Sequence, residues 1–361
     1  MTVLYIAAGG GGDAIASRAI GELINPGAAP SIATLSWDRL IIDPLPGPRS
    51  IKDFDGLRSP RASVYQVTPA SKPIERAGSS LPRLAGALRA DLYLLDPHNG
   101  VDGLGMQITA IAEHIGATEL LIVDVGGDIL ALGPDIGLRS PTADLMTLAA
   151  SSTTRIPTRV LVTGIGLDGE LSPELVSRRL EELRATTLAT LNSQFEEIQD
   201  VFSWHPSEAS GMLAAAANGV TGKVEVRDAG LLVELNSRAA TAYAFDAASL
   251  LEISPGRHLI GTTSLGQVED LVATHTGIND LEYERQKAAA MLGSDRPQTF
   301  KGRHSVDINE LLRDARDRGA DFVTLRRLSE ATGCKDSGAR GKLADFLQSR
   351  ILPPSLVRTR V

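Results

Sequence analysis

Apolar residues follow two alternating patterns over residues 1–290 of the chain. Short, continuous apolar runs predict buried strands, and the segments between them carry apolar residues at helical spacing. The predicted strands cover residues 3–8, 31–37, 91–96, 120–123 and 158–163, and the predicted helices cover residues 14–24, 81–90, 106–115, 145–150 and 180–198. Because strands that alternate with helices usually pair in parallel, we predict an α/β fold with a mainly parallel, doubly wound (Rossmann-like) sheet.

The pattern changes after residue 292. Residues 293–302 follow neither period and are predicted to form a linker. Beyond it, amphipathic segments predict three short helices, and the segment 325–333 with the helix after it has the spacing of a helix-turn-helix. The predicted organisation is a ligand-binding α/β domain over residues 1–292 and a small helical C-terminal extension over residues 303–361.

Composition narrows the classes of protein to consider. A chain of 361 residues with 43% hydrophobic residues can bury a large α/β core. Its net charge of −8 and its aromatic content of 4% argue against nucleic-acid binding, and the small basic surplus of residues 303–361 does not reverse this expectation. No apolar run reaches the roughly 18 residues of a membrane span. We therefore expect no membrane partner. Cys334 is the only cysteine and can close no intrachain disulfide, so we expect a cytoplasmic protein.

The amino-terminal segment has the pattern of a strand, a glycine-rich turn and a helix. Glycines in such a turn let a ligand approach the backbone, and the free N–H groups of the first helical turn attract an anion. The motif is not the full Gly-x-Gly-x-x-Gly dinucleotide fingerprint. Asp13 would repel a phosphate unless it binds a ribose hydroxyl, a metal ion or the N–H groups of its own helix. The candidate ligand-binding residues here are Gly9, Gly10, Gly11, Gly12 and Asp13.

Glycine loops bounded by aspartates follow two later strands. The first loop runs from Asp96 to Asp102, and the second from Asp124 to Asp128. If these strands are parallel neighbours, their ends lie about 5 Å apart and the four carboxylates share one edge of the sheet. Three interpretations remain open: a divalent ion such as Mg²⁺, bound sugar hydroxyls, or aspartates that only cap helices and turns. The candidate metal ligands are Asp96, Asp102, Asp124 and Asp128.

Further candidate ligand-binding residues belong to the same loops. Gly126 and Gly127 form the turn of the second loop, and Asp168 follows a third strand that ends in glycines. Asn99 lies in the first loop. Arg139 is the cation best placed along the chain to neutralise the acidic edge or a substrate phosphate.

Proton transfer needs an acid or a base beside this edge. His205 with Glu208 is one candidate pair, and His98 is another candidate group, although each also fits a capping or surface role. The candidate catalytic residues are Asp124, Asp128, His205, Glu208 and His98. No second histidine has the spacing of a zinc ligand. Ser140, before a proline, is predicted to cap the next helix.

As a set, these motifs resemble a prokaryotic protein family of unknown function. The motifs are Ala-Gly-Gly-Gly-Gly-Asp at 8–13, Gly-Val-Asp-Gly-Leu at 100–104, Val-Asp-Val-Gly-Gly-Asp-Ile-Leu at 123–130, Ser-Pro-x-x-Asp at 140–144 and Gly-Ile-Gly-x-Asp-Gly-Glu-Leu at 164–171. Thr-Ser-Leu at 263–265 and Tyr-Glu-Arg at 283–285 fit the same family. The resemblance covers about residues 1–290. It implies the fold and the position of the site, and no reaction.

These observations predict an enzyme that acts on a small phosphorylated, nucleotide-like or glycosidic metabolite. Metal-assisted hydrolysis or group transfer at the carboxyl ends of the strands is the expected reaction class, with Mg²⁺ or another divalent ion as a cofactor. One alternative is an oxidoreductase with a nucleotide cofactor, NAD(P). A second alternative is a non-catalytic protein that senses a metabolite or binds a partner through the C-terminal helices. A homo-oligomer is compatible with each of these.

Overall fold

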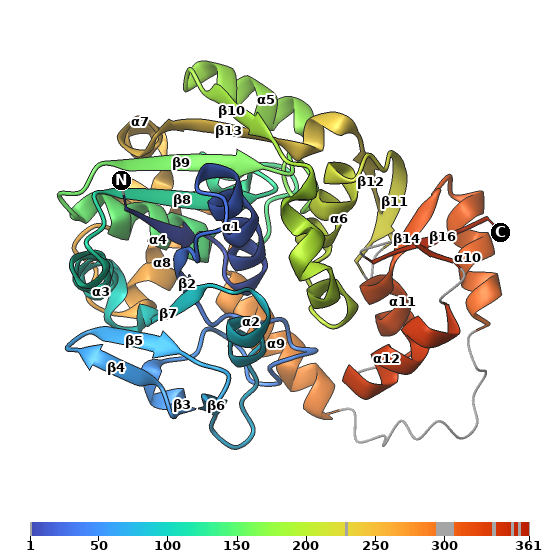
Figure 1. Ribbon diagram of the computed structural model, residues 1–361, viewed down its shortest axis with the longest axis horizontal. Helices are drawn as coiled ribbons and strands as arrows, with labels where there is room; N and C mark the ends of the chain where they lie inside the picture. Colours follow the sequence, from blue (N-terminus) through green and yellow to red (C-terminus); the bar gives the residue numbers. More distant parts are fainter. Residues whose placement is uncertain are drawn as a thin grey trace.

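The computed structural model describes residues 2–227, 230–293, 307–333, 337–347, 350–352 and 355–360. A large sheet with helices on both faces forms the main body, and a smaller unit of C-terminal residues lies beside it (Figure 1). The remainder of the predicted linker, residues 294–302, lies outside the described residues. None of the described helices is long and apolar enough to cross a membrane.

Five parallel strands form the centre of the nine-stranded sheet. In sheet order they are β9 (Thr158–Thr163), β8 (Glu119–Val125), β1 (Val3–Ala7), β2 (Ser31–Leu35) and β7 (Asp91–Leu95). Counted along the chain among themselves, these strands have the order 5-4-1-2-3, which is that of a doubly wound sheet. Antiparallel strands complete both edges: β13 (Thr241–Asp246) and β10 (Thr186–Thr190) beyond β9, and β5 (Val64–Val67) and β4 (Arg58–Arg61) beyond β7. The predicted fold class is confirmed.

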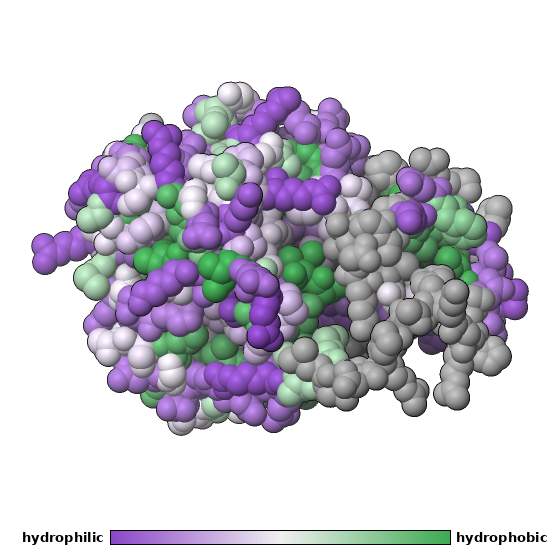
Figure 2. Space-filling view, turned by 90° about the horizontal axis from the view of Figure 1, so that it is seen from below, coloured by the Kyte–Doolittle hydropathy of each residue, from purple (hydrophilic) through white to green (hydrophobic). Residues whose placement is uncertain are grey.

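Helices cover both faces because the central strands are apolar on both sides, and all seven residues of β8 are buried. One core cluster includes residues of α1 (Gly11–Ile24), α2 (Leu81–Ala87) and α6 (Glu208–Ala217). The other includes residues of α3 (Gly100–Ile115), α4 (Thr142–Thr153), α5 (Pro173–Glu182), α7 (Ala247–Ile253) and α8 (Leu265–Thr276). This body also contains α9 (Asp280–Gly293) and the strand pair β3 (Phe54–Asp55) and β6 (Lys72–Pro73). Seen from below, hydrophilic residues cover much of the surface, and hydrophobic residues gather toward its middle (Figure 2).

The long helix predicted over residues 180–198 is not formed. Helix α5 ends at Glu182, and the chain then adds β10 to the edge of the sheet before a 3-10 segment at Ser193–Ser203. The leucines of this stretch have helical spacing, but β10 contains three threonines, which are β-branched and favour a strand. Pairing with β13 therefore prevails over the apolar periodicity.

The C-terminal extension contains strands as well as helices. Its elements are α10 (Ile308–Asp317), β14 (Phe322–Thr324), α11 (Leu325–Ala331), α12 (Ser337–Phe346), β15 (Ile351–Leu352) and β16 (Leu356–Arg358). Its three strands join a hairpin of the main body, β11 (Gly222–Val226) and β12 (Leu231–Leu235), in the order β12-β11-β14-β16-β15. The prediction of a helical extension did not include these strands, because each is only two or three residues long and leaves little periodic signal.

Candidate functional site

The site lies where the order of the parallel strands reverses. Strands β1 and β8 are neighbours, paired from Val3↔Glu119 to Ala7↔Val123. From β1 the sheet continues through β2 to β7, and from β8 it continues in the other direction to β9. Ligands of doubly wound proteins bind at the carboxyl ends of the two strands that flank such a point.

Three aspartates meet at this point. Asp13 lies in the first turn of α1, Asp124 lies in β8, and Asp144 lies in the first turn of α4. One carboxylate oxygen of each lies within 4.8 Å of the others, an arrangement that could hold a metal ion. Oδ2 of Asp124 and Oδ1 of Asp144 are buried and have no hydrogen-bond partner in the described part of the chain. Asp13 Oδ2 accepts a hydrogen bond from the Gly9 N–H at 2.6 Å.

Burial and mutual repulsion change the proton affinities of these groups. Burial raises the pKa of Asp13 to about 7, although the Gly9 N–H stabilises its charged form. Burial, followed by repulsion from neighbouring carboxylates, raises the pKa values of Asp124 and Asp144 well above their usual range. The pKa of Asp168 is raised to about 7 by burial and then by the charge of Glu170. These groups therefore retain protons that free aspartates release, and a divalent cation would remove that penalty.

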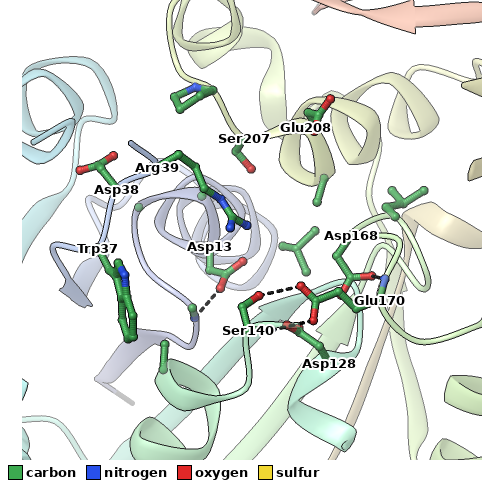
Figure 3. Close-up of a pocket in the computed structure, with 18 of the residues that line it drawn as sticks. Asp13, Trp37, Asp38, Arg39, Asp128, Ser140, Asp168, Glu170, Ser207 and Glu208 are labelled. Atoms are coloured by element: carbon green, nitrogen blue, oxygen red, sulfur yellow. Dashed lines mark hydrogen bonds between the residues drawn. The ribbon is translucent and has the colours of Figure 1, made fainter. Parts of the chain in front are cut away.

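A cavity of about 170 Å³ opens above the aspartates. Asp13, Asp128 and Asp168 line it, and Figure 3 shows their side chains around the same space. Asp124, of which 1% is exposed, lies beneath this surface. The lining also includes three arginines and a histidine, namely Arg39, Arg227, Arg326 and His205. The pocket thus combines carboxylates with cationic groups.

Ser140 and Glu170 form one wall of the pocket. Glu170 accepts a hydrogen bond from the Ser140 hydroxyl at 2.6 Å (Figure 3). It also accepts hydrogen bonds from the backbone N–H groups of Arg139 and Ser140. The prediction that Ser140 caps α4 is wrong, because Pro141 occupies the N-cap position and Ser140 binds Glu170 instead. The Arg139 side chain is exposed and is not part of the pocket lining.

The glycine loop packs closely against other loops of the protein. A Cβ atom on Gly12 would lie 2.7 Å from Ser207 Oγ, and one on Gly11 would lie 3.0 Å from Ser80 Oγ. Gly10 has a φ angle of 123°, which favours glycine. Gly9, Gly11 and Gly12 still line the pocket. These glycines are therefore needed at least partly for the approach of protein side chains, which reduces the support for a bound dinucleotide.

The glycines that follow β8 position another predicted residue. Gly126 and Gly127 have φ angles of 133° and 107°. A Cβ atom on Gly126 would lie 2.3 Å from the carboxylate carbon of Asp168, so only glycine lets that carboxylate approach the end of β8. The strand ends that carry Asp124 and Asp168 do share one site.

The predicted group of four carboxylates, however, is not formed. Strands β7 and β8 are separated by β2 and β1, so Asp96 and Asp102 do not meet Asp124 and Asp128. Asp96 instead accepts hydrogen bonds from the Ser50 hydroxyl and from the Ile51 and His98 N–H groups. Asp102 is exposed in the first turn of α3.

Neither His98 nor Asn99 lines the pocket. His98 Nδ1 lies 2.9 Å from Asp96 Oδ1, and its side chain is 44% exposed. Burial would raise the pKa of Asp96, but hydrogen bonds from His98 and from Ser50 and Ile51 lower it to about 2. This loop therefore holds its aspartate as a charged cap, away from the acidic pocket.

His205 and Glu208 lie together at the pocket. His205 is 8% exposed, and its Nδ1 accepts the Ser207 N–H at 3.2 Å. Glu208 accepts hydrogen bonds from the Thr324 hydroxyl and the Arg227 N–H, and its other oxygen lies 3.4 Å from Arg326. The carboxylate of Glu208 is thus already engaged in binding the C-terminal unit.

Sequence reasoning missed several residues of the pocket. Asp144 was interpreted as part of a helix start, although it belongs to the Ser-Pro-x-x-Asp motif, which pointed to it. Glu170 appeared only as part of a loop motif. The three arginines come from separate parts of the chain, and no local pattern connects them: they are Arg39, Arg227 and Arg326.

A family model described as "Protein of unknown function (DUF1152)" matches residues 4–288. The chain belongs to this family. The match covers the α/β body and ends before the C-terminal unit. No curated protein and no solved structure matched the chain. Family membership therefore agrees with the resemblance in the motifs and leaves the reaction to be inferred from the site.

Proposed function

We propose that this protein is an enzyme that binds a divalent cation at Asp13, Asp124 and Asp144 and acts on a small anionic metabolite. The observation that carries the proposal is the convergence of three carboxylates within 4.8 Å, two of them with buried oxygens that have no hydrogen-bond partner among the described residues. Buried carboxylates at the switch point of a doubly wound sheet are well suited to Mg²⁺ or Mn²⁺, which prefer oxygen ligands.

The chemistry that we propose is hydrolysis or group transfer on a phosphorylated, nucleotide-like or glycosidic compound. A cation bound at this position would polarise an oxygen of the substrate or lower the pKa of a water molecule. His205 would move a proton at the pocket wall, and Asp128 and Asp168 would orient hydroxyl groups or water. Arg39, whose guanidinium points toward Asp13 in Figure 3, would neutralise a phosphate group.

The two alternatives have less support. An NAD(P)-dependent oxidoreductase would place a pyrophosphate at the first turn of α1, where Asp13 and Asp144 would repel it. A non-catalytic sensor would use the same pocket without turnover. Measurements of ligand binding and turnover distinguish both alternatives from the proposal.

The test begins with the metal-free protein. Calorimetric titration with Mg²⁺ and Mn²⁺ should show one site, and the ions should raise Tm because they bind the folded state. Phosphomonoesters, nucleotides and glycosides are then screened for turnover with and without the ion. Turnover that depends on the ion supports the proposal. Absence of ion binding contradicts it, NADPH binding favours the oxidoreductase, and ligand binding without turnover favours the sensor.

A further inference from the structure

The C-terminal unit reaches the pocket of the α/β body. Helix α11 begins at Leu325, and Arg326, the next residue, lines the same pocket as Asp13 and Asp144. The family match ends at residue 288, so this arginine comes from a part of the chain outside the matched region. A side chain more than 300 positions from Asp13 in the sequence therefore shares its pocket.

The guanidinium of Arg326 is held in place. Its Nε donates a hydrogen bond to Glu330 at 3.0 Å, and its Nη1 lies 3.4 Å from Glu208. The side chain is only 17% exposed. Thr324 donates its hydroxyl to the same Glu208 carboxylate. These contacts fix the position of the cation before any ligand arrives, which limits the entropy lost when a ligand binds.

The unit itself is firmly attached to the body. Strand β14 pairs in parallel with β11. Glu225 of β11 has a buried carboxylate that pairs with two arginines of the C-terminal unit, with Arg318 and with Arg327, the latter at 3.2 Å. The hairpin side of the unit also faces the body, because a Cβ atom on Gly211 of α6 would lie 2.6 Å from Ser355 Oγ. The side of the C-terminal unit that carries Ser355 therefore packs against the body.

The other two arginines of the pocket come from the α/β body and have different contacts from Arg326. Arg227 donates to the backbone carbonyl of Asp168 and lies 3.4 Å from Glu170, so it stabilises the protein wall. Arg39 is exposed and makes no ion pair within 4 Å in the described part of the chain. Arg326 is partly buried, and it is the pocket arginine that the C-terminal unit contributes.

We propose that the C-terminal unit completes the ligand site and that Arg326 binds an anionic group of the ligand, a phosphate or a carboxylate. The inference rests on the proposed function, because it assigns a substrate class to the same pocket. A guanidinium has five N–H donors, so Arg326 can donate to such a group while its Nε and Nη1 contact Glu330 and Glu208. The aspartates and a cation hold one end of the ligand, and Arg326 selects ligands that carry a negative charge.

The test uses the full-length protein and two variants of the C-terminal unit. R326Q removes the cation at the pocket. R318Q is the matched control, because it removes an arginine of the same unit that pairs with Glu225 and does not line the pocket. Binding of Mn²⁺ alone is measured by electron paramagnetic resonance, and binding of inorganic phosphate in the presence of Mg²⁺ is measured by calorimetry.

We expect R326Q to bind Mn²⁺ as wild type does and to lose about 10- to 100-fold in phosphate affinity, the range for one charged hydrogen-bonded contact. R318Q should retain both affinities, and R326K should recover part of the loss. Equal phosphate affinity in wild type and R326Q, an equal loss in R318Q, or no phosphate binding by wild type overturns the role of Arg326. Absence of Mn²⁺ binding in wild type contradicts the proposed function instead.

Discussion

The hydroxyl of Thr142 lies 2.5 Å from the carboxylate of Asp280, and the Thr142 N–H donates to the other oxygen at 3.2 Å. This contact joins the first residue of α4 to the first residue of α9, and both residues are buried. Asp144, a member of the acidic triad, follows Thr142 by two residues. The contact therefore fixes the helix turn that carries a proposed metal ligand.

We expect T142V to lower the free energy of unfolding by about 1–3 kcal/mol, because the buried Asp280 carboxylate loses a donor. Burial raises the pKa of Asp280 to about 6, and Thr142 acts in the opposite direction. Without the hydroxyl this pKa rises further, so the loss should be greater at pH 8, where the group is ionised, than at pH 5. Urea unfolding at both pH values measures this. T142S keeps the hydroxyl and should resemble wild type; an equal loss in both variants would contradict the explanation.

Asp124→Asn should separate stability from function. The variant loses a buried like charge, so the metal-free protein should melt at the same temperature as wild type or higher at pH 8. Its affinity for Mn²⁺ should fall by more than the roughly 10- to 100-fold that loss of an outer-shell partner costs. D102N is the control, since Asp102 is exposed on α3 and should leave both quantities unchanged. If D124N binds Mn²⁺ with wild-type affinity, Asp124 is not a metal ligand.

Asp96→Asn should lower stability and leave metal affinity unchanged. Its two carboxylate oxygens accept separate pairs of hydrogen bonds, and an amide offers only one acceptor oxygen. We expect a loss of about 1–3 kcal/mol in unfolding free energy with no change in Mn²⁺ affinity. Because the pKa of Asp96 is lowered to about 2, its stabilisation is present above about pH 4 and is lost as the pH falls toward 2. Chemical unfolding combined with metal titration checks both parts. A weakened metal affinity would show that Asp96 contributes to metal binding and would contradict this prediction.

The stability of the metal-free protein should fall as the pH rises from about 4 to 7. The pKa values of Asp13 and Asp168 are raised to about 7, so the folded state binds more protons than the unfolded state in this range. Their contribution is fully present below the unfolded pKa and is lost as the pH passes the folded value. The increase in Tm caused by Mg²⁺ should accordingly be larger at pH 8 than at pH 5. Thermal melts at the two pH values, with and without the ion, provide the measurement, and an increase that is larger at pH 5 would contradict it.

The sequence predicted a candidate site at the carboxyl ends of the strands, because Asp124 and Asp168 belong to apolar runs that end in glycine turns. It was not sufficient to identify which strands are neighbours. The order of parallel strands depends on the direction of each crossover, and no residue in the strands records it. For that reason Asp96 was grouped with Asp124, whereas the residue that joins Asp124 and Asp144 is Asp13, from the helix that follows β1, the strand beside β8.

The arginines show a second limit of sequence reasoning. Arg326 was noticed only within a helix-turn-helix spacing, because its proximity to Glu208 depends on the pairing of β14 with β11. These strands are nearly 100 positions apart, and β14 has three residues. Pairing at such a distance leaves no periodic signal in either segment.

The same pairing has a consequence for synthesis of the protein. Until the ribosome has released residues 322–324, β11 has no neighbour on the side where β14 will lie, and its backbone N–H and C=O groups are open to other chains. The buried carboxylate of Glu225 also lacks Arg327 at that stage, although Arg318 is synthesised before β14. We therefore expect nascent chains that stop before residue 322 to need chaperones and to aggregate more readily than the complete protein.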